Sequence, residues 1–312
     1  MSAKQQKVSF YKLFQQFPNE ESAEQYFAAK RWGESGRFCP HCGSVRTVRA
    51  KDKMPYRCKD CRKRFSVRTG TMLAESRISL HKWLMAIYLL NTNLKGVSSC
   101  KLARDLDITQ KTAWFLAHRI RRAFDDQQNA KFVSPIEIDE SYVGGKYRNM
   151  HKSKKPRMVG AGAQDKTPVV GIRERSTGRV KAKVTEPVSG VMLRGRVMET
   201  VKEGAVVYTD QNPSYPGLVK KNYRHEAVNH SVGEYIKGQA HTNGVESFWA
   251  MLKRGHTGVY HKMSRKHLQR YIDEYAGRHN IRPLATMEQM DVIFKGMEGK
   301  RLTYRELIQT GN

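Results

Sequence analysis

The stretch VVYTDQNPSY, residues 206–215, is an apolar run that ends in a carboxylate and passes at once into a turn-like Asn-Pro pair. A short apolar run bounded by turn residues indicates a buried β-strand, here residues 205–210. Asp210 would then stand at the carboxyl end of that strand. A lone aspartate in this position often only caps the next helix, so its meaning depends on whether other carboxylates in the chain can meet it.

The chain as a whole is strongly basic. Its 312 residues include 57 Lys and Arg against 29 Asp and Glu, a formal charge of +28. An excess of this size predicts a polyanionic partner, of which nucleic acid is the commonest; general stickiness of a basic surface is the alternative. Hydrophobic residues make up 39%, which is enough to bury a core and excludes a disordered basic tail.

The sequence contains no sign of a membrane or secretory segment. No apolar run reaches about 18 residues, the length that a membrane-spanning helix needs. The first residues, MSAKQQKVSF, lack the apolar core of a signal peptide. We therefore expect a cytoplasmic protein, associated with the nucleoid if its partner is DNA.

Four of the five cysteines form two pairs with metal-ligand spacing. FCPHCGSV contains Cys39 and Cys42, YRCKDCRKRF contains Cys58 and Cys61, and fifteen residues separate the pairs. Two C-x2-C knuckles predict structural Zn²⁺ held by four cysteines in a zinc ribbon, with no position open for catalysis. Two disulfides are the alternative, which a reducing cytoplasm disfavours. Cys100 is expected to be a small core residue of a helix.

Helical periodicity covers residues 80–124. Within GVSSCKLARDLDITQKTAWFLAHRIRRAF, Ser98 or Ser99 can cap one short helix and Thr109 can cap a second. Two short helices with a tight break suit a helix-turn-helix, in which the start of the second helix enters the major groove. Plain helical packing is the alternative. The residues that would face bases or phosphates are Gln110, Lys111 and Thr112.

Two further carboxylates fit with Asp210. PIEIDESY, residues 135–142, alternates as a strand and carries Asp139 near its end. GQAHTNGVESFWAMLKRG, residues 238–255, predicts a loop and a helix, with Asn243 as a candidate cap and Glu246 in the first turn. If the fold brings them together, Asp139, Asp210 and Glu246 would hold two divalent cations, Mg²⁺ or Mn²⁺, about 3.5–4 Å apart, for displacement at phosphorus.

Each of these acids also has an ordinary alternative, as an exposed strand residue, a cap or a favourable helix start. Glu137 and Glu140 are not expected to take part. Alternation points Glu140 to the opposite face of the strand from Asp139, and Glu137 lies further from the strand end. Trp249, in the same helix as Glu246, is expected to pack against the sheet rather than to stack on a base.

Other segments complete an alternating pattern of strands and helices. Strands are predicted at 167–174, 178–185 and 222–228, and a helix at 189–201. Residues 143–164, VGGKYRNMHKSKKPRMVGAGAQ, hold six basic residues and no acid. That composition predicts a loop or hairpin tip able to contact phosphates, with Lys154 and Lys155 among its basic residues.

Three motifs resemble those of a known family. IEIDESYVGGK, VYTDQNPSY and HTNGVESFWAMLKRG are similar to the motifs of insertion-sequence DDE transposases, in the group with an N-terminal zinc ribbon, and the resemblance covers about residues 20–280 in order. It implies a ribonuclease-H-like mixed sheet flanked by helices, with Asp139 and Asp210 as the first two metal-binding acids. It also implies cutting of DNA at the element's terminal inverted repeats and joining of the freed 3′-hydroxyl to target DNA.

The third acidic position is variable in that family, where Asn, His or Glu occurs with a Lys downstream. Here Glu246 fits by its carboxylate and by the 35 residues between it and Asp210, while Asn243 and His241 are secondary candidates. Lys253, two helical turns further on, would be the accompanying lysine and would hold a phosphate. Arg254 continues this basic strip along the expected DNA backbone.

The expected fold is therefore a multidomain chain of the α+β and α/β classes. The expected function is a DNA transposase that works as a homo-oligomer on double-stranded DNA. The alternatives are a metal-dependent endonuclease of the same fold that does not join ends, and a non-catalytic zinc-ribbon DNA-binding regulator. The expected parts are an N-terminal helical segment (1–36), a four-cysteine zinc ribbon (37–70), a helix-turn-helix-like DNA-binding segment (76–125), a ribonuclease-H-like catalytic domain (132–282) and a C-terminal helical tail (283–312).

Overall fold

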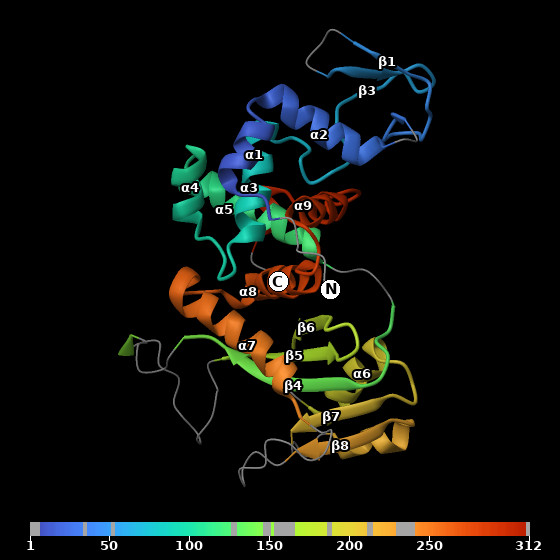
Figure 1. Ribbon diagram of the computed structural model, residues 1–312, viewed down its shortest axis with the longest axis vertical. Helices are drawn as coiled ribbons and strands as arrows, with labels where there is room; N and C mark the ends of the chain where they lie inside the picture. The colour runs from blue at the N-terminus through green and yellow to red at the C-terminus, as the bar shows by residue number, and fades with distance from the viewer. Residues whose placement is uncertain are drawn as a thin grey trace. The chain divides into compact units, whose positions relative to one another are not determined.

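The strands predicted downstream of residue 130 form one mixed sheet (Figure 1). The computed structural model describes residues 7–33, 36–50, 54–125, 130–145, 151–152, 166–185, 189–210, 215–228 and 241–309. The strands of this sheet are β4 (Ile136–Val143), β5 (Thr167–Glu174), β6 (Val180–Val184), β7 (Val206–Asp210) and β8 (Arg224–Val228). They lie in the order β6-β5-β4-β7-β8, with β5 antiparallel to β4 and β6, and with β7 and β8 parallel to β4.

Pairing along β4 is uneven on its two sides. On one side it pairs with β5 over its whole length, which places Asp139 opposite Gly171. On the other side β7 pairs with β4 only through Ile136↔Val207 and Glu137↔Tyr208. The end of β4 that carries Asp139 is therefore left uncovered on the β7 side.

Helices cover both faces of the sheet, because alternate strand residues are apolar on each side. On one face, Val169 of β5 packs with Trp249 and Leu252 of α7 (Asn243–Gly255) and with Ile272 of α8 (Arg265–Ile281). Ile138 of β4 belongs to the core on the other face. That core also contains Leu193 and Val197 of α6 (Gly190–Thr200), and Leu218 of the short helix η4 (Pro216–Lys221). A mixed sheet between helices is the ribonuclease-H-like architecture that was expected, and it confirms the fold class.

The chain divides into two compact units. The sheet and its helices make up Asp126–Asn280, while Met1–Asp125 and Ile281–Asn312 make up the other unit. The helices of this other unit are α1 (Phe10–Gln16), α2 (Glu20–Trp32), α3 (Leu80–Thr92), α4 (Ser99–Leu106), α5 (Gln110–Arg121), the short η1 (Arg122–Phe124), α9 (Thr286–Lys295) and α10 (Tyr304–Ile308). They share one core, in which the Phe27 ring of α2 lies 4.7 Å from the Phe294 ring of α9.

The C-terminal residues therefore belong to a unit that begins at the other end of the chain. The sequence predicted a C-terminal helical tail at residues 283–312, and Met290 and Phe294 of α9 in this segment are buried in one core with residues of α2 and α3. The exposed fraction of both side chains is 0%, so α9 is an integral part of this unit. The other predicted domain boundaries stay predictions.

The helix-turn-helix-like segment forms as its capping residues predict. The hydroxyl of Ser98 accepts the amide N–H of Lys101 at the start of α4, and the hydroxyl of Thr109 accepts that of Thr112 at the start of α5. Asp107 takes a left-handed conformation (φ 49°) where α4 ends, which makes the tight break. The prediction for Cys100 was wrong: it is exposed, because α4 turns Leu102, Ala103 and Leu106 inward instead.

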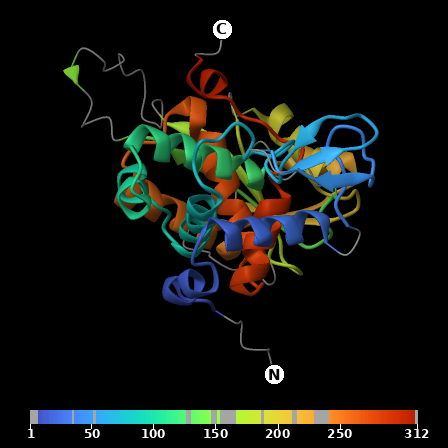
Figure 2. The same ribbon diagram turned by 90° about the horizontal axis from the view of Figure 1, so that it is seen from above.

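Three short antiparallel strands form the ribbon beside α2 (Figure 2). They are β1 (Thr47–Arg49), β2 (Tyr56–Cys58) and β3 (Arg64–Phe65). Trp32 at the end of α2 packs edge-on against Tyr56, with ring centroids 5.3 Å apart. A sheet this small has little core of its own, so it depends on α2 and on its cysteines.

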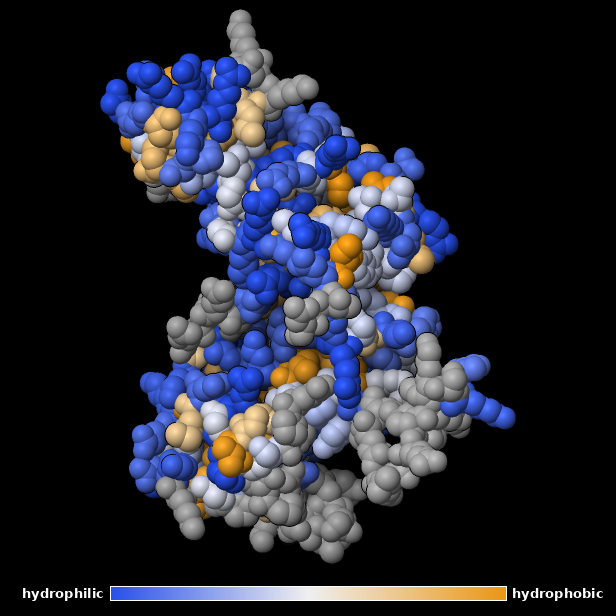
Figure 3. All heavy atoms as spheres, turned by 180° about the vertical axis from the view of Figure 1, so that it is seen from behind, coloured by the Kyte–Doolittle hydropathy of each residue, from blue (hydrophilic) through white to orange (hydrophobic). Residues whose placement is uncertain are grey.

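The view in Figure 3 shows a surface that is largely hydrophilic over the described residues of each unit, with scattered hydrophobic side chains. This is consistent with the large excess of Lys and Arg in the sequence. In the described part of the chain, no helix combines the length and the hydropathy that crossing a membrane would need.

Candidate active site

Two aspartates from neighbouring parallel strands meet at one edge of the sheet. Asp210 is the last residue of β7, and Asp139 lies on β4 just beyond its pairing with β7. In the parallel register of β4 and β7, Glu137 lies beside Tyr208, so Asp139 and Asp210, each two residues further along its strand, come close together. Side-chain oxygens of Asp139, Glu140 and Asp210 lie within 4.8 Å of one another, and all three residues are half-buried. We refer to these three residues as the acidic cluster.

The presence of Glu140 in the acidic cluster corrects the expectation that strand alternation would separate it from Asp139. Alternation itself holds, since Glu140 accepts a hydrogen bond from the hydroxyl of Tyr215, which belongs to the core on the α6 face. Because β7 leaves this end of β4 uncovered, a side chain with two methylene groups can bring its carboxylate around the strand edge. Side-chain length and local strand pairing thus override the simple two-face pattern.

The electrostatics of the acidic cluster are unfavourable without a cation. Burial, the largest effect, and the negative charges of Asp210 and Glu140 together raise the pKa of Asp139 from 3.8 to about 7. The pKa of Tyr215 is raised well above its usual value by its burial and by Glu140. Perturbed carboxylates grouped at a strand end are typical of a functional site.

The third predicted acid, Glu246, lies in the first turn of α7 and is exposed. It is not a member of the acidic cluster, but its charge is among those that raise the pKa of Asp139. The hydroxyl of Thr242 donates a 2.6 Å hydrogen bond to Glu246 Oε1. Glu246 therefore lies near the acidic cluster and is held by a residue at the start of its own helix.

The two secondary candidates lie on either side of the helix start. Asn243 is the first residue of α7 and is exposed, so the prediction that it caps the helix was wrong: Thr242 occupies the cap position. The imidazole Nδ1 of His241 lies 3.7 Å from Glu137 Oε1. His241 is thus associated with Glu137 rather than with the acidic cluster.

The basic residues predicted downstream end the same helix. Lys253 and Arg254 are exposed in the last turn of α7, which favours cations there through the helix dipole. Trp249 between them and Glu246 is buried against the sheet, as expected. The side chain of Lys253 is therefore available to a phosphate on the solvent side.

Glu137 has a role that the sequence did not reveal. Its exposed fraction is 0%, and one carboxylate oxygen pairs with Arg173 at 3.1 Å and with Arg175 at 2.8 Å. Alternation correctly placed it on the same face as Asp139. Glu137 lies opposite Arg173 on β5. This pairing would have identified Arg173 as a partner, but it depends on the strand register, which a single sequence does not show.

The acidic cluster has the donor chemistry that Mg²⁺ or Mn²⁺ requires. Hard divalent cations take carboxylate oxygens, and one oxygen from each of Asp139, Glu140 and Asp210 lies within reach of a single ion. Their mutual repulsion, seen in the raised pKa of Asp139, would be relieved by a positive charge at their centre. The residues present therefore fit a divalent cation.

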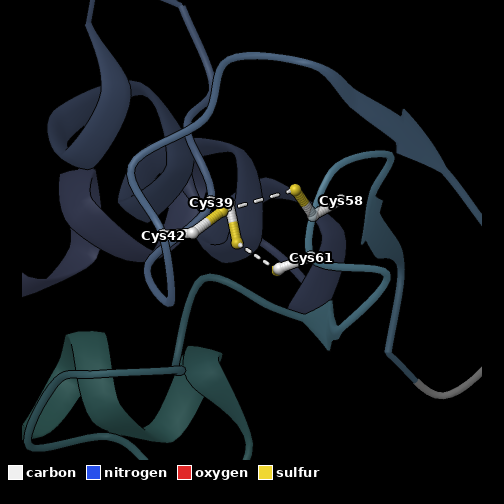
Figure 4. A group of neighbouring side chains, drawn as sticks. All are labelled: Cys39, Cys42, Cys58 and Cys61. Carbon is white, nitrogen blue, oxygen red and sulfur yellow. Dashed lines mark hydrogen bonds between the residues drawn. The ribbon is translucent and has the colours of Figure 1, made fainter.

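The four cysteines of the ribbon meet in the other unit (Figure 4). All four sulfur atoms lie within 4.8 Å of one another, with Cys39 Sγ 3.6 Å from Cys61 Sγ and Cys42 Sγ 3.6 Å from Cys58 Sγ. Four thiolates at about 2.3 Å from a tetrahedral zinc ion would lie about 3.8 Å apart. The cysteines thus fit structural Zn²⁺, each knuckle contributing one sulfur to each close contact.

The predicted DNA-reading residues stand at the start of α5. Gln110 and Lys111 are exposed, while Thr112 is half-buried and shares a 2.8 Å hydrogen bond with Thr109. The ammonium of Lys111 lies 4.8 Å from the ring centre of Tyr304 in α10. The two other predicted contacts, Lys154 and Lys155, lie outside the described residues.

Comparison with known proteins matches each unit to a family. Residues 132–280 match the model of the ISXO2-like transposase domain, and residues 18–64 match the model of the transposase zinc-ribbon domain. A protein in the transposable element ISH50 of Halobacterium salinarum is 29% identical over 282 residues, which cover 85% of this chain and 92% of the relative. That relative is described as uncharacterised.

The chain therefore carries the two domains of an insertion-sequence transposase with an N-terminal zinc ribbon. The two matches coincide with the two sites. The zinc-ribbon match contains all four cysteines, and the transposase-domain match contains Asp139, Asp210, Glu246 and Lys253. For this transposase, the four-cysteine ribbon supports structural zinc, and the two matched transposase domains imply DNA as the partner.

Proposed function

We propose that this transposase cuts DNA at the terminal inverted repeats of its own element and joins the freed 3′-hydroxyl groups to target DNA. The observation that supports this best is the meeting of Asp139 and Asp210 at one edge of a ribonuclease-H-like sheet. The raised pKa of Asp139 adds to it, because a group of carboxylates that repel one another is suited to holding cations.

Asp139, Asp210 and Glu246 would hold two ions of Mg²⁺ or Mn²⁺, and Glu140 offers a further oxygen. Two such ions supply activation of the attacking oxygen and stabilisation of the leaving oxygen in an in-line displacement at phosphorus. The chain's own contribution is the fixed edge formed by β4 and β7, which sets the spacing of the aspartates. Burial of Asp139 keeps bulk water from screening its interaction with a bound ion.

Lys253 would hold a phosphate of the DNA strand being cut. It lies seven residues after Glu246, about 10 Å along the helix axis, and its side chain is exposed. Arg254 would contact the next phosphate along the strand. His241 and Asn243 stay as secondary candidates for the third metal-binding residue, and the nearness of His241 to Glu137 favours Glu246 over it.

Recognition of the element ends would fall to the other unit. In a helix-turn-helix the start of the second helix reads base edges, and Gln110 and Lys111 are exposed there on α5. Thr112, on the same turn of α5, would also contact bases or phosphates. The zinc ribbon, which is rich in Lys and Arg, would add phosphate contacts, and we propose the same for Lys154 and Lys155.

Joining two element ends to one target requires both ends to be held in a single complex. We therefore propose that the transposase is a homo-oligomer on DNA. Light scattering of the complex with paired ends measures its mass. A complex that holds both ends with one protein chain contradicts this part of the proposal.

The decisive experiment is a cleavage assay on DNA that carries the ends of the element encoding this chain. The purified protein is incubated with Mg²⁺ and the strand products are mapped, beside an Asp210→Ala control. The proposal expects metal-dependent cuts at the element boundary followed by joined products. Both should be absent with Asp210→Ala, while binding to the same DNA remains.

The other outcomes separate the alternatives. Cuts without joined products would identify an endonuclease of the same fold. Tight binding without cuts by the wild-type protein would identify a DNA-binding regulator. Cuts of equal rate by wild type and Asp210→Ala would show that the acidic cluster does not carry the reaction.

A further inference from the structure

Helix α7, which carries Glu246, begins without a side-chain cap of its own. Thr242 occupies the N-cap position, but its hydroxyl donates to Glu246 Oε1 at 2.6 Å and makes no capping hydrogen bond. The first amides of a helix have no partner inside the helix, and a buried helix start must satisfy them in another way. Thr242 and Val245 are both buried, with exposed fractions of 1% and 0%.

Glu137 supplies the missing cap from a different element. Its Oε2 accepts the backbone N–H of Val245, the third residue of α7, at 2.9 Å. That amide is one of the two that an N-cap side chain usually satisfies. A carboxylate is also favoured at a helix N-terminus, where the helix dipole is positive. A residue of β4 thus caps a helix that begins 106 positions later.

The other oxygen of Glu137 ties the helix start to the neighbouring strand. Glu137 Oε1 accepts from Arg173 Nη1 at 3.1 Å and from Arg175 Nε at 2.8 Å. Arg175 then donates through Nη2 to the carbonyl of His241 at 2.6 Å, directly before α7, and stacks on the ring of Tyr208 at 4.2 Å. One buried carboxylate therefore links β4, the end of β5, β7 and the segment that leads into α7.

The first turn of α7 lies so close to this ion pair that any residue larger than glycine at position 244 would displace the side chains of Glu137 and Arg173. A Cβ at Gly244 would lie 2.2 Å from Arg173 Nη1 and 2.6 Å from Glu137 Oε2. Either contact is too short for any side chain without movement of the pair. Gly244 thus allows the first turn of α7 to pack directly against the carboxylate of Glu137.

We propose that Glu137 is a positioning residue that sets the place of Glu246 relative to Asp139. Glu137 lies on the same strand as Asp139, two residues earlier, and holds the amide of the residue directly before Glu246. The distance between the two acids is thereby fixed through one strand and one hydrogen bond. The inference rests on the proposed function only in taking Glu246 as a ligand of the catalytic cations.

The first test measures the helix start without any metal or DNA. Hydrogen exchange of the peptide that covers residues 241–250 is compared in wild type, Glu137→Ala and Glu174→Gln. Glu174 is the matched control, since it is also a buried glutamate of the sheet but accepts from Val133 N–H at 2.5 Å and from Thr177. We expect faster exchange at the start of α7 in Glu137→Ala alone. Equal protection in Glu137→Ala and wild type would overturn the inference.

The second test measures Mn²⁺ affinity by calorimetry in a double-mutant cycle. Glu137→Ala and Glu246→Gln should each weaken binding of Mn²⁺, with Glu137→Ala falling in the range of about 10–100-fold that is usual for residues that orient a ligand. The double variant should bind no more weakly than Glu246→Gln, because Glu137 acts through Glu246. Losses that multiply in the double variant would mean that Glu137 acts independently, which contradicts the inference.

Two further variants keep the test decisive if Glu137→Ala does not fold. Glu137→Gln keeps an oxygen that can accept the Val245 amide, so its exchange and affinity should lie between those of wild type and Glu137→Ala. Gly244→Ala disturbs the same contact from the helix side and should reproduce the faster exchange. Normal exchange and affinity in both variants would overturn the inference.

Failure of this inference and failure of the proposed function are distinguishable. If wild type binds Mn²⁺ but cuts no DNA, the proposed function fails, whereas the exchange and affinity results still decide the role of Glu137. If wild type cuts and joins DNA while Glu137→Ala keeps normal exchange and affinity, the proposed function stands and the positioning role falls.

Discussion

At the scale of single residues, Asp139 shows how burial and neighbouring negative charges disfavour ionisation of a carboxyl group in the acidic cluster. Burial and the charges of Asp210 and Glu140 raise its pKa to about 7 from an ordinary value of 3.8. The folded protein therefore binds a proton at Asp139 more tightly than the unfolded chain does. The contribution of this proton to the free energy of unfolding is fully present below about pH 4 and is lost as the pH rises through about 7.

Because the ionised carboxylate of Asp139 is disfavoured in the folded protein, replacing it by a neutral side chain should increase the free energy of unfolding. In metal-free protein at about pH 8, Asp139→Asn should raise the melting temperature by a few degrees, on a scale of about 2–4 °C per kcal/mol. At about pH 4 it should have little effect, since Asp139 is then protonated in the wild type. Calorimetry at the two pH values measures the difference. An equal change at both pH values would contradict the assigned pKa.

Residue-scale features were only partly predictable from the sequence. Asp139 and Asp210 could be found because each lies on a recognisable strand, although β4 continues past Asp139 to Val143 whereas β7 ends at Asp210. The inclusion of Glu140 in the acidic cluster could not be predicted, because it depends on how far β7 pairs along β4. The capping of Val245 by Glu137 depends on a contact between positions 108 apart in the sequence, and no local pattern encodes such a contact.

At the scale of elements, the close approach of α7 to the sheet decides where its acidic and basic residues lie. Gly171 on β5 pairs with Asp139 and lies beneath Trp249, so that a Cβ at Gly171 would be 2.5 Å from Trp249 Cζ2. The Trp249 ring therefore packs α7 against β5, and the hydrogen bond from Val245 to Glu137 holds the first turn of α7 against β4. The strands and helices themselves followed from apolar periodicity, whereas this seating needed the packed structure.

Gly171→Ala should push Trp249 from the sheet and destabilise the unit by about 1–3 kcal/mol, as overpacking usually does. Urea unfolding followed by tryptophan fluorescence measures this loss. Gly195→Ala is the matched control, because a Cβ at Gly195 in α6 meets open space. It should be neutral or stabilising by up to about 1 kcal/mol. Equal stability of Gly171→Ala and wild type would contradict the close approach.

The zinc ribbon is an element whose stability depends on its metal. Cys58 is fully buried, and Cys58→Ser should release the zinc and unfold β1 to β3. The zinc content of purified protein, measured by inductively coupled plasma mass spectrometry, should fall from one ion per chain to near zero. Cys100→Ser, which changes an exposed cysteine outside the ribbon, should keep its zinc. Wild-type protein without zinc would contradict the assignment.

At the scale of the whole molecule, the two ends of the sequence build one unit, and the residues between them build the sheet unit. Length and motif order indicated several domains but gave no sign that residues after 281 pack with α2 and α3. The reason is that α9 has the same apolar periodicity that any surface helix has. Its partner is set by tertiary packing between segments more than 200 residues apart, such as Phe27 and Phe294.

Truncation of Phe294 tests this arrangement. Phe294→Ala removes a fully buried ring and should destabilise the unit by about 3–5 kcal/mol. Hydrogen exchange of the peptides covering α2 and α3 should become faster, although α9 is far from them in sequence. Ile308→Ala, at a side chain with an exposed fraction of 49%, should change the stability by less than about 0.5 kcal/mol. Unchanged exchange in α2 and α3 would contradict the shared core.

The most direct test of the proposed metal site replaces one of its ligands, so that the variant can use Mn²⁺ but not Mg²⁺. Asp210→Cys replaces a hard oxygen ligand by a thiolate, which Mg²⁺ accepts poorly and Mn²⁺ accepts more readily. With DNA carrying the element ends, this variant should not cut in Mg²⁺ and should recover cutting in Mn²⁺, whereas Asp210→Ala should be inactive with both ions. Cutting by Asp210→Ala in Mg²⁺ at the wild-type rate would show that Asp210 does not hold the catalytic metal.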